Sequence, residues 1–174
     1  EDAGLTIRHT RKPDVSWLAD DVNGLLTKAG VTVPYIMLVP GCSARHPQKR
    51  WPYYAELAER LIAAGETVVT APGPDEVELA RSIPGTCIEK TNWAELAGIL
   101  KGARFVIGND TGPSHLAAHM GVPGLALFGT HMPAERTGIL RENFGAIEVE
   151  DLAALSVTRV FDEVTRRLAH SNSV

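Results

Sequence analysis

Short apolar runs alternate with amphipathic segments along most of this sequence. Each run has the length of a strand and is rich in Val, Ile, Leu or Phe, which is typical of strands buried on both faces. The alternation predicts a parallel sheet covered by helices on both faces. Right-handed crossovers make this a doubly wound, Rossmann-like α/β domain. The runs lie at residues 35–39, 67–71, 86–89, 104–107, 124–128 and 146–149.

The segments between the runs carry helix signals. Residues 53–64 read YYAELAERLIAA, with apolar side chains spaced to share one face. Asp75, with Glu78 three residues later, is a variant of the capping box. We expect Asp14 to cap the first helix and Gly30 to end it. The other expected helices lie at residues 15–29, 75–82, 93–101, 113–120 and 152–169.

Length and composition limit the other possibilities. The 174 residues suit one domain, and we expect a linker and helix over residues 1–34 and a single domain over residues 35–174. The formal net charge is -4, so no nucleic acid partner is expected. No apolar run approaches the ~20 residues of a membrane-spanning helix. Cys42 and Cys87 fit no metal spacing, and two reduced thiols predict a cytoplasmic protein.

In a sheet of this kind the ligand lies beyond the carboxyl ends of the strands. The first run is followed by a long polar loop, residues 40–52, that contains Lys49 and Arg50. These cations are suited to neutralise a diphosphate, Lys49 as a point charge and Arg50 as a fork. The alternative is a solvated loop in which Trp51 plugs the core, and the sequence favours neither.

Two other loops offer weaker signals. Gly73, Asp75 and Glu76 follow the second run. Gly73 lets the backbone approach a ligand, and Asp75 or Glu76 can accept hydrogen bonds from ribose hydroxyls. A turn followed by a helix cap explains Asp75 at least as well. Gly129, after the fifth run, either offers an N–H to a phosphate or belongs to a simple turn.

The strongest signal is GNDTGPSHLAAHMG at residues 108–121, after the fourth run. Gly112 before a proline predicts a helix entrance. The free N–H groups of such an entrance form an anion site, to which Thr111 and Ser114 add hydroxyl donors. His115 is the histidine of this segment that we place at the ligand.

Asp110 is the unexpected member of this segment. A carboxylate beside a phosphate is repulsive unless it binds sugar hydroxyls or holds a cation, for which Lys49 is the candidate. The alternative is that Asp110 and Thr111 only cap the helix. Ser114 is not in a G-x-S-x-G elbow, and the two histidines at i, i+4 lack the glutamate of a zincin. We therefore expect neither a serine nucleophile nor a metal site.

Three segments together resemble glycosyltransferase family nine, the ADP-heptose:lipopolysaccharide heptosyltransferases. The block D-T-G-x-S-H-L-A-A after an apolar strand is distinctive of that family. The resemblance covers about residues 35–130, and more loosely the whole chain. The segments read PGCSARHPQKRWPYYAELAERL (residues 40–61), APGPDEVELA (residues 71–80) and GNDTGPSHLAAHMGVPGLALFG (residues 108–129).

The resemblance implies one half of a GT-B glycosyltransferase. In that family the C-terminal Rossmann-like domain binds the ADP-sugar and the N-terminal domain binds the lipid acceptor; this chain resembles only the former. Lys49 and Asp110 become its catalytic residues: Lys49 contacts phosphate, and Asp110 contacts the sugar or holds Lys49. Thr111 and Gly112 give N–H groups to the diphosphate, with His115 close by. The catalytic base belongs to the N-terminal domain, which we expect to be absent here.

The implied function is inverting transfer of heptose from ADP-heptose to the inner core of lipopolysaccharide. The expected partners are the nucleotide-sugar donor and, through the missing domain, a lipid-linked core oligosaccharide. The parent enzyme is expected to be cytoplasmic, with peripheral contact at the inner face of the bacterial inner membrane. No D-x-D motif occurs, so neither an obligatory metal nor another cofactor is expected.

One stretch departs from the family pattern. After Phe128 and Gly129 the family usually continues with P-T-D-P, whereas residues 130–133 read THMP. This departure leaves the donor sugar and the contacts near Thr130 open. Two alternatives also stay open: another GT-B sugar-nucleotide enzyme, such as a UDP-sugar transferase or epimerase, and a non-catalytic nucleotide-binding module.

Overall fold

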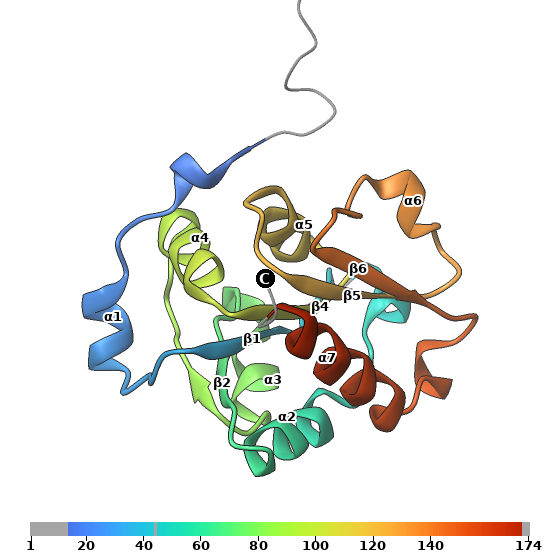
Figure 1. Ribbon diagram of the computed structural model, residues 1–174, viewed down its shortest axis with the longest axis horizontal. Coiled ribbons are helices and arrows are strands. Elements are labelled where there is room, and N and C mark those ends of the chain that lie inside the picture. Colours follow the sequence, from blue (N-terminus) through green and yellow to red (C-terminus); the bar gives the residue numbers. More distant parts are fainter. Residues whose placement is uncertain (1–13, 44, 172–174) are drawn as a thin grey trace, which may run out of the picture.

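A six-stranded parallel sheet forms the centre of the computed structural model, which describes residues 14–43 and 45–171 (Figure 1). The strand order is β3-β2-β1-β4-β5-β6, and all neighbouring strands pair in parallel. This confirms the doubly wound, Rossmann-like fold expected from the apolar runs. The strands are β1 (Tyr35–Val39), β2 (Thr67–Thr70), β3 (Thr86–Cys87), β4 (Phe105–Asn109), β5 (Gly124–Phe128) and β6 (Phe144–Glu148).

Helices cover both faces of this sheet (Figure 1). Side chains of α1, α4 and α5 belong to the core on one face, and those of α2 and α7 to the core on the other. None of the helices in the described ranges is both long enough and apolar enough to cross a membrane. The α-helices are α1 (Asn23–Lys28), α2 (Tyr54–Ala63), α3 (Val77–Arg81), α4 (Trp93–Gly102), α5 (Gly112–His119), α6 (Ala134–Thr137) and α7 (Val157–Ser171), and the 3-10 helices are η1 (Ser16–Leu18), η2 (Pro47–Lys49), η3 (Pro74–Glu76) and η4 (Leu152–Ala154).

The central strands are buried on both faces because successive side chains point in opposite directions. Along β1, Tyr35, Met37 and Val39 pack into one core, whereas Ile36 and Leu38 pack into the other. Every residue of β1, β4 and β5 is buried. The interior of these three strands therefore offers no side chain to a ligand, and a site must be built from the strand ends and from the loops and helix starts that follow them.

The helix expected over residues 15–29 is wrong in its length, because only η1 and α1 form there. The carboxylate of Asp14 accepts a hydrogen bond from the Ser16 N–H at 2.8 Å. Asp21 accepts one in the same way from the Asn23 N–H at 3.0 Å. These local bonds give the backbone an alternative to a continuous helix.

The capping box expected at Asp75 and Glu78 is also wrong. Asp75 lies in η3, and α3 has Glu76 as its N-cap, whose side chain makes no cap hydrogen bond. The segment expected as one helix over residues 152–169 is divided into η4 and α7. Leu155 is extended between these two elements, and this interrupts the helical pattern.

The two edges of the sheet are built differently. β3, at one edge, has only two residues. β6, at the other edge, has five residues, and Arg167 of α7 lies against its Gly145. A Cβ at Gly145 would overlap the Arg167 guanidinium. The absence of a side chain at this glycine thus lets a charged group lie close to the backbone of the outer strand.

The buried side chain of Asn109 joins the end of β4 to the loop that follows β1. Its Oδ1 accepts hydrogen bonds from the Trp51 N–H and the Tyr54 hydroxyl, both at 3.1 Å. Its Nδ2 donates to the carbonyl oxygens of Pro40, at 2.9 Å, and Gly41, at 3.2 Å. One side chain therefore fixes both ends of the polar loop in which η2 lies.

We predict that Asn109→Ala lowers the free energy of unfolding by about 2–5 kcal/mol, because each buried group that loses its partner costs about 1–3 kcal/mol. Urea denaturation of the two proteins measures the difference. The control is Asn23→Ala, at an exposed position on α1, which should change stability by less than about 0.5 kcal/mol. Equal stability of the two variants would contradict a structural role for Asn109.

Candidate functional site

Lys49 and Asp110 form an ion pair beyond the carboxyl ends of β1 and β4. The Lys49 Nζ lies 2.7 Å from Asp110 Oδ2, and the two side chains are 23% and 7% exposed. β1 and β4 are neighbours in the sheet, but the chain leaves β1 toward β2 and enters β4 after β3. The loops after such a pair of strands diverge and leave the crevice in which open α/β sheets bind ligands.

Two histidines complete the surroundings of the Asp110 carboxylate. His115 Nε2 lies 3.0 Å from Oδ1, and His131 Nε2 lies 2.8 Å from Oδ2. The hydrogen bond from His115 holds the pKa of Asp110 far below its usual range, helped by Lys49 and His131 and against the effect of burial. Asp110 is therefore ionised at neutral pH, and its charge is compensated by groups from three parts of the chain.

The contacts define the tautomers of the two rings. A carboxylate only accepts hydrogen bonds, so His115 and His131 each carry a proton on Nε2. The His131 ring stacks on Phe128 with centroids 5.9 Å apart, which fixes its orientation. Its Nδ1 is buried and has no hydrogen-bond partner among the described residues. His119 lies away from the carboxylate, with its Nδ1 2.7 Å from the His115 carbonyl oxygen.

The N-terminus of α5 lies next to this cluster. Thr111 is the N-cap, and its side chain makes no cap hydrogen bond. The alternative in which Thr111 caps the helix through its hydroxyl is therefore wrong. Thr111 Oγ1 and Ser114 Oγ are buried and have no partner within the described part of the chain. The uncapped N–H groups and the positive end of the helix dipole make this entrance attractive to an anion.

The other predicted residues lie in the loops around the Lys49–Asp110 pair. The Glu76 carboxylate lies against Gly41 in the loop after β1, where a Cβ would overlap it. Gly73 lies near the same carboxylate, since a Cβ there would be 3.8 Å from Glu76 Oε2. Asp75 and Arg50 are exposed. Glu76 thus faces the loop after β1 and Asp75 faces solvent, and ribose binding by either residue stays a prediction.

Gly129 and Trp51 are also placed by the structure. A Cβ at Gly129 would lie 3.7 Å from His131 Nδ1, so this glycine lies beside the ring. Trp51 is 1% exposed, and its Nε1 donates to the Leu155 carbonyl oxygen at 2.9 Å. Trp51 therefore fills the core, as one interpretation of the loop after β1 holds, while Lys49 reaches Asp110; binding of a diphosphate by Lys49 stays a prediction.

Sequence reasoning missed two residues of this site, His131 and Asn109. The signal for His131 was its position, three residues after the end of β5 and therefore at the same edge of the sheet as Asp110. The apolar run ends at residue 107 and so predicts a loop at Asn109, whereas Asn109 is the last residue of β4 and is fully buried. A buried amide at a strand end must find partners, and these lie in the loop after β1.

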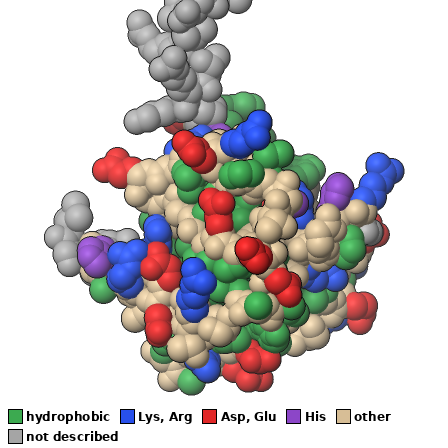
Figure 2. Space-filling model, turned by 90° about the vertical axis from the view of Figure 1, so that its right-hand side faces the viewer, with side chains coloured by type: hydrophobic (Ala, Val, Ile, Leu, Met, Phe, Trp, Pro, Cys, Tyr) green, Lys and Arg blue, Asp and Glu red, His purple; other side chains and the backbone are tan. Residues whose placement is uncertain are grey.

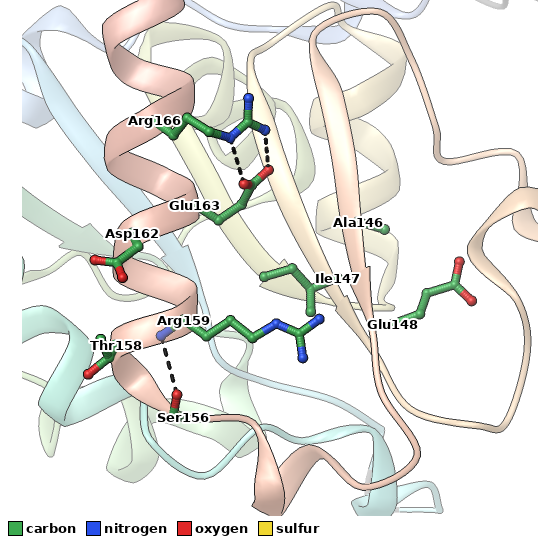
Figure 3. A pocket seen from close by; sticks show the side chains of 9 residues that line it. All are labelled: Ala146, Ile147, Glu148, Ser156, Thr158, Arg159, Asp162, Glu163 and Arg166. Carbon is green, nitrogen blue, oxygen red and sulfur yellow. Dashed lines mark hydrogen bonds and ion pairs between the residues drawn. The ribbon is translucent and has the colours of Figure 1, made fainter.

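A separate hollow of about 590 Å³ lies between β6 and α7 (Figure 3). No predicted site residue lines it, and within it Arg166 pairs with Glu163 at 2.7 Å. Arg166 and Arg167 lower the pKa of Glu163 to about 2.

Figure 2 shows acidic and basic side chains interspersed on the face it presents, without a continuous basic surface. Within residues 14–43 and 45–171, no group of His, Cys, Asp and Glu is arranged to hold a metal ion.

Comparison with known proteins places this geometry in a family. The family profile described as glycosyltransferase family 9 (heptosyltransferase) matches residues 8–161. Lipopolysaccharide heptosyltransferase 3 of Escherichia coli is 31% identical over 129 residues, which cover 67% of this chain and 37% of that protein. The chain spans about a third of the length of the curated relatives it matches, at 37%, 32% and 32%.

Two solved structures share the fold. The structure of E. coli ADP-heptose LPS heptosyltransferase II superimposes with a TM-score of 0.73 at 23% identity, covering 97% of this chain and 54% of that chain. E. coli heptosyltransferase WaaC with ADP-2-deoxy-2-fluoro heptose gives a TM-score of 0.67 at 25% identity, covering 76% and 42%.

We predict that Asp110→Asn destabilises the protein in a pH-dependent way. The folded-state pKa of Asp110 is lowered, so its charge stabilises the fold above the unfolded value of about 3.9 and ceases to do so as the pH falls through the folded value. At about pH 7 the variant should lose about 1–3 kcal/mol. The difference from the wild type should shrink as the pH is lowered from about 5 to about 2.

Guanidinium denaturation across this pH range measures the effect. Asp162→Asn is the matched control, because Asp162 is exposed on α7; it should change stability by less than about 0.5 kcal/mol. A difference for Asp110→Asn that stays constant from neutral to acid pH would mean that the charge of Asp110 does not stabilise the fold.

Proposed function

The chain belongs to glycosyltransferase family 9, and we propose that it is the donor-binding domain of an inverting transferase that moves heptose from ADP-heptose to the lipopolysaccharide inner core. The proposal rests above all on the Lys49–Asp110 pair beside the N-terminus of α5. Relatives named as lipopolysaccharide heptosyltransferases, and a similar structure that contains an ADP-heptose analogue, support the choice of donor.

The leaving group explains what the site must do. When an acceptor hydroxyl attacks the anomeric carbon, negative charge builds on the departing ADP. The Lys49 ammonium and the N–H groups at the start of α5 provide preorganised positive potential at that position. The Thr111 hydroxyl, at the N-cap of α5, has no partner within the described residues and adds a donor at this entrance, whereas the fully buried Ser114 hydroxyl lies against Gly108 of β4. These groups stabilise charge that is larger in the transition state than in the bound donor.

Asp110 has a positioning role in this scheme. Its carboxylate holds Lys49 at the mouth of the crevice before the donor arrives, at 2.7 Å. Its negative charge would repel a phosphate if it were bare, but hydrogen bonds from His115 and His131 reduce this effect. We propose that Glu76, whose carboxylate lies against Gly41 in the loop after β1, binds the ribose hydroxyls.

We propose that the donor site needs no divalent cation. The sequence has no D-x-D motif, and Lys49 with the helix N-terminus supplies the positive charge for a diphosphate. We further propose that the acceptor site and the catalytic base belong to another part of the enzyme. The relatives are about three times as long as the matched region of this chain, which leaves room for that part. A cytoplasmic enzyme at the inner face of the membrane fits the two free cysteines.

The nucleotide tests the proposed function. We expect ADP to bind at least about tenfold more tightly than UDP, a difference of about 1.4 kcal/mol. Calorimetric titration of the protein with each nucleotide measures this directly. UDP that binds as tightly as ADP would favour a UDP-sugar enzyme and would contradict the ADP-heptose assignment.

We predict that Lys49→Ala weakens ADP binding by about 1.5–3 kcal/mol, the range of hydrogen bonds to charged groups. The titrations are run in EDTA, and the wild-type affinity should be the same when Mg²⁺ replaces the chelator. Lys28→Ala, at an exposed position on α1, is the control and should bind ADP like the wild type. Unchanged affinity in Lys49→Ala would remove Lys49 from the diphosphate site, and an absolute need for Mg²⁺ would refute the metal-free scheme.

A further inference from the structure

One oxygen of Asp110 serves two donors that can both be cationic. Oδ2 accepts hydrogen bonds from Lys49 Nζ at 2.7 Å and from His131 Nε2 at 2.8 Å. The other oxygen, Oδ1, is held by His115 at 3.0 Å. Lys49 and His131 share the same oxygen atom. A change in the charge of one therefore affects the protonation of the other more directly than it affects the protonation of His115.

Without a ligand, two features of the site oppose a second proton on His131, although the Asp110 carboxylate lies beside it. Its Nε2–H already donates a hydrogen bond to Asp110, and its Nδ1 is buried without a partner among the described residues. A second proton would bury an unpartnered N–H and place a positive charge beside the Lys49 ammonium. Both effects oppose protonation. Lys49 is therefore the cation that compensates Asp110 in the free protein.

Donor binding changes this balance, if Lys49 binds the diphosphate as the proposed function requires. The ammonium then shares its charge with the phosphates, and the Asp110 carboxylate, 7% exposed, loses part of its compensation. We propose that His131 takes up a proton when the donor diphosphate draws Lys49 away, and that it replaces Lys49 as the cation beside Asp110. His131 is thus a positioning residue, because its protonation frees Lys49 for the donor.

The other charged groups around the ring come from every neighbouring element. His115 faces the same carboxylate from α5. On the side of β6, Glu148 and Glu150 line a hollow of about 300 Å³ together with Thr130 and Met132, which flank His131 in the sequence. The Asp151 carboxylate caps η4 by accepting from Ala153. The exposed charged residues of the adjoining α6 are Glu135 and Arg136. These mostly acidic groups are the same with and without the donor, so the position of Lys49 is what changes the balance at His131.

The sign of the pH dependence follows from the uptake of a proton. The donor complex binds more protons than the free protein, so affinity is highest at acid pH. It falls as the pH rises through the range in which histidine titrates, by up to about tenfold per pH unit for one proton. The proposal predicts this loss for a donor whose own phosphates do not titrate near neutral pH, as in a nucleotide diphosphate-sugar.

The experiment is calorimetric titration with ADP-heptose at several pH values between about 6.5 and 8.5, around the usual histidine range. At each pH, buffers of different ionisation enthalpy report the protons taken up. His131→Gln keeps an N–H donor for Asp110 but cannot become cationic. His170→Gln makes the same change at an exposed position near the end of α7.

We expect the wild type and His170→Gln to take up a proton and to lose affinity as the pH rises. His131→Gln should take up none, should match the wild type at high pH, and should bind about tenfold more weakly at the acid end. Binding without proton uptake would overturn the inference and leave the proposed function intact. Uptake that persists in His131→Gln would assign the proton to another group, which also overturns it. If ADP-heptose does not bind the wild type at any pH, the proposed function fails and the inference fails with it.

A second measurement does not depend on the variant. In nitrogen NMR spectra of the wild type, His131 should be a neutral ring with its proton on Nε2 at about pH 7.5, within the range in which histidine is normally uncharged. Saturation with ADP-heptose should move the midpoint of its titration to higher pH. A midpoint that stays in place in the bound protein would contradict protonation of His131 on donor binding.

Discussion

The side chain of Asn109 is the contact on which the arrangement of the site depends. Among its described residues, the long loop after β1 contains the short 3-10 helix η2, so other parts of the chain must fix its path. Asn109 does this through hydrogen bonds to the beginning and the end of the loop. Since Asn109 is also the last residue of β4, the same amide sets where Lys49 lies and where Asp110 begins its own loop. Packing of the sheet and placement of the charges are thereby linked.

The ion pair between Lys49 and Asp110 explains why a carboxylate can lie beside a predicted phosphate site. An anionic side chain at the start of a helix that binds anions is unfavourable when it is considered alone. Here Asp110 accepts hydrogen bonds from Lys49 and two histidines, and it holds these donors where the loops after β1 and β4 diverge. The carboxylate thus gathers hydrogen-bond donors from three parts of the chain, and Lys49 is the cation among them.

Much of the fold could be predicted from the sequence, because the signal for it is local. β1 and β5 lie where their apolar runs predicted, since every residue in them is buried. Helices were less well predicted where side chains compete for backbone groups, as Asp14 and Asp21 do before α1. The small α6 has only four residues, and no periodic pattern can appear over that length.

The site was predictable in part, for a related reason. Position after a strand placed Lys49 and Asp110 at one edge of the sheet, and strand order then made them neighbours. The contact of His131 with Asp110 depends on β5 lying beside β4 and on the stacking of the ring on Phe128. Neither is visible in a pattern of apolar residues. The same is true of the partners of Asn109, which lie in a loop 58 and 69 residues away in the sequence.

The construction of the sheet edges has a consequence for the behaviour of the protein in concentrated solution. An open strand edge offers unpaired backbone groups to any other strand, and this is how many proteins begin to aggregate. Here β3 is too short to serve as such a template, and the Arg167 guanidinium lies close against the middle of β6. The side chains of a strand added at this edge would have to pack beside that charged group on the face of the sheet, which disfavours the addition. Gly145, by leaving room for the arginine, thus places a charge where another molecule would have to bury it.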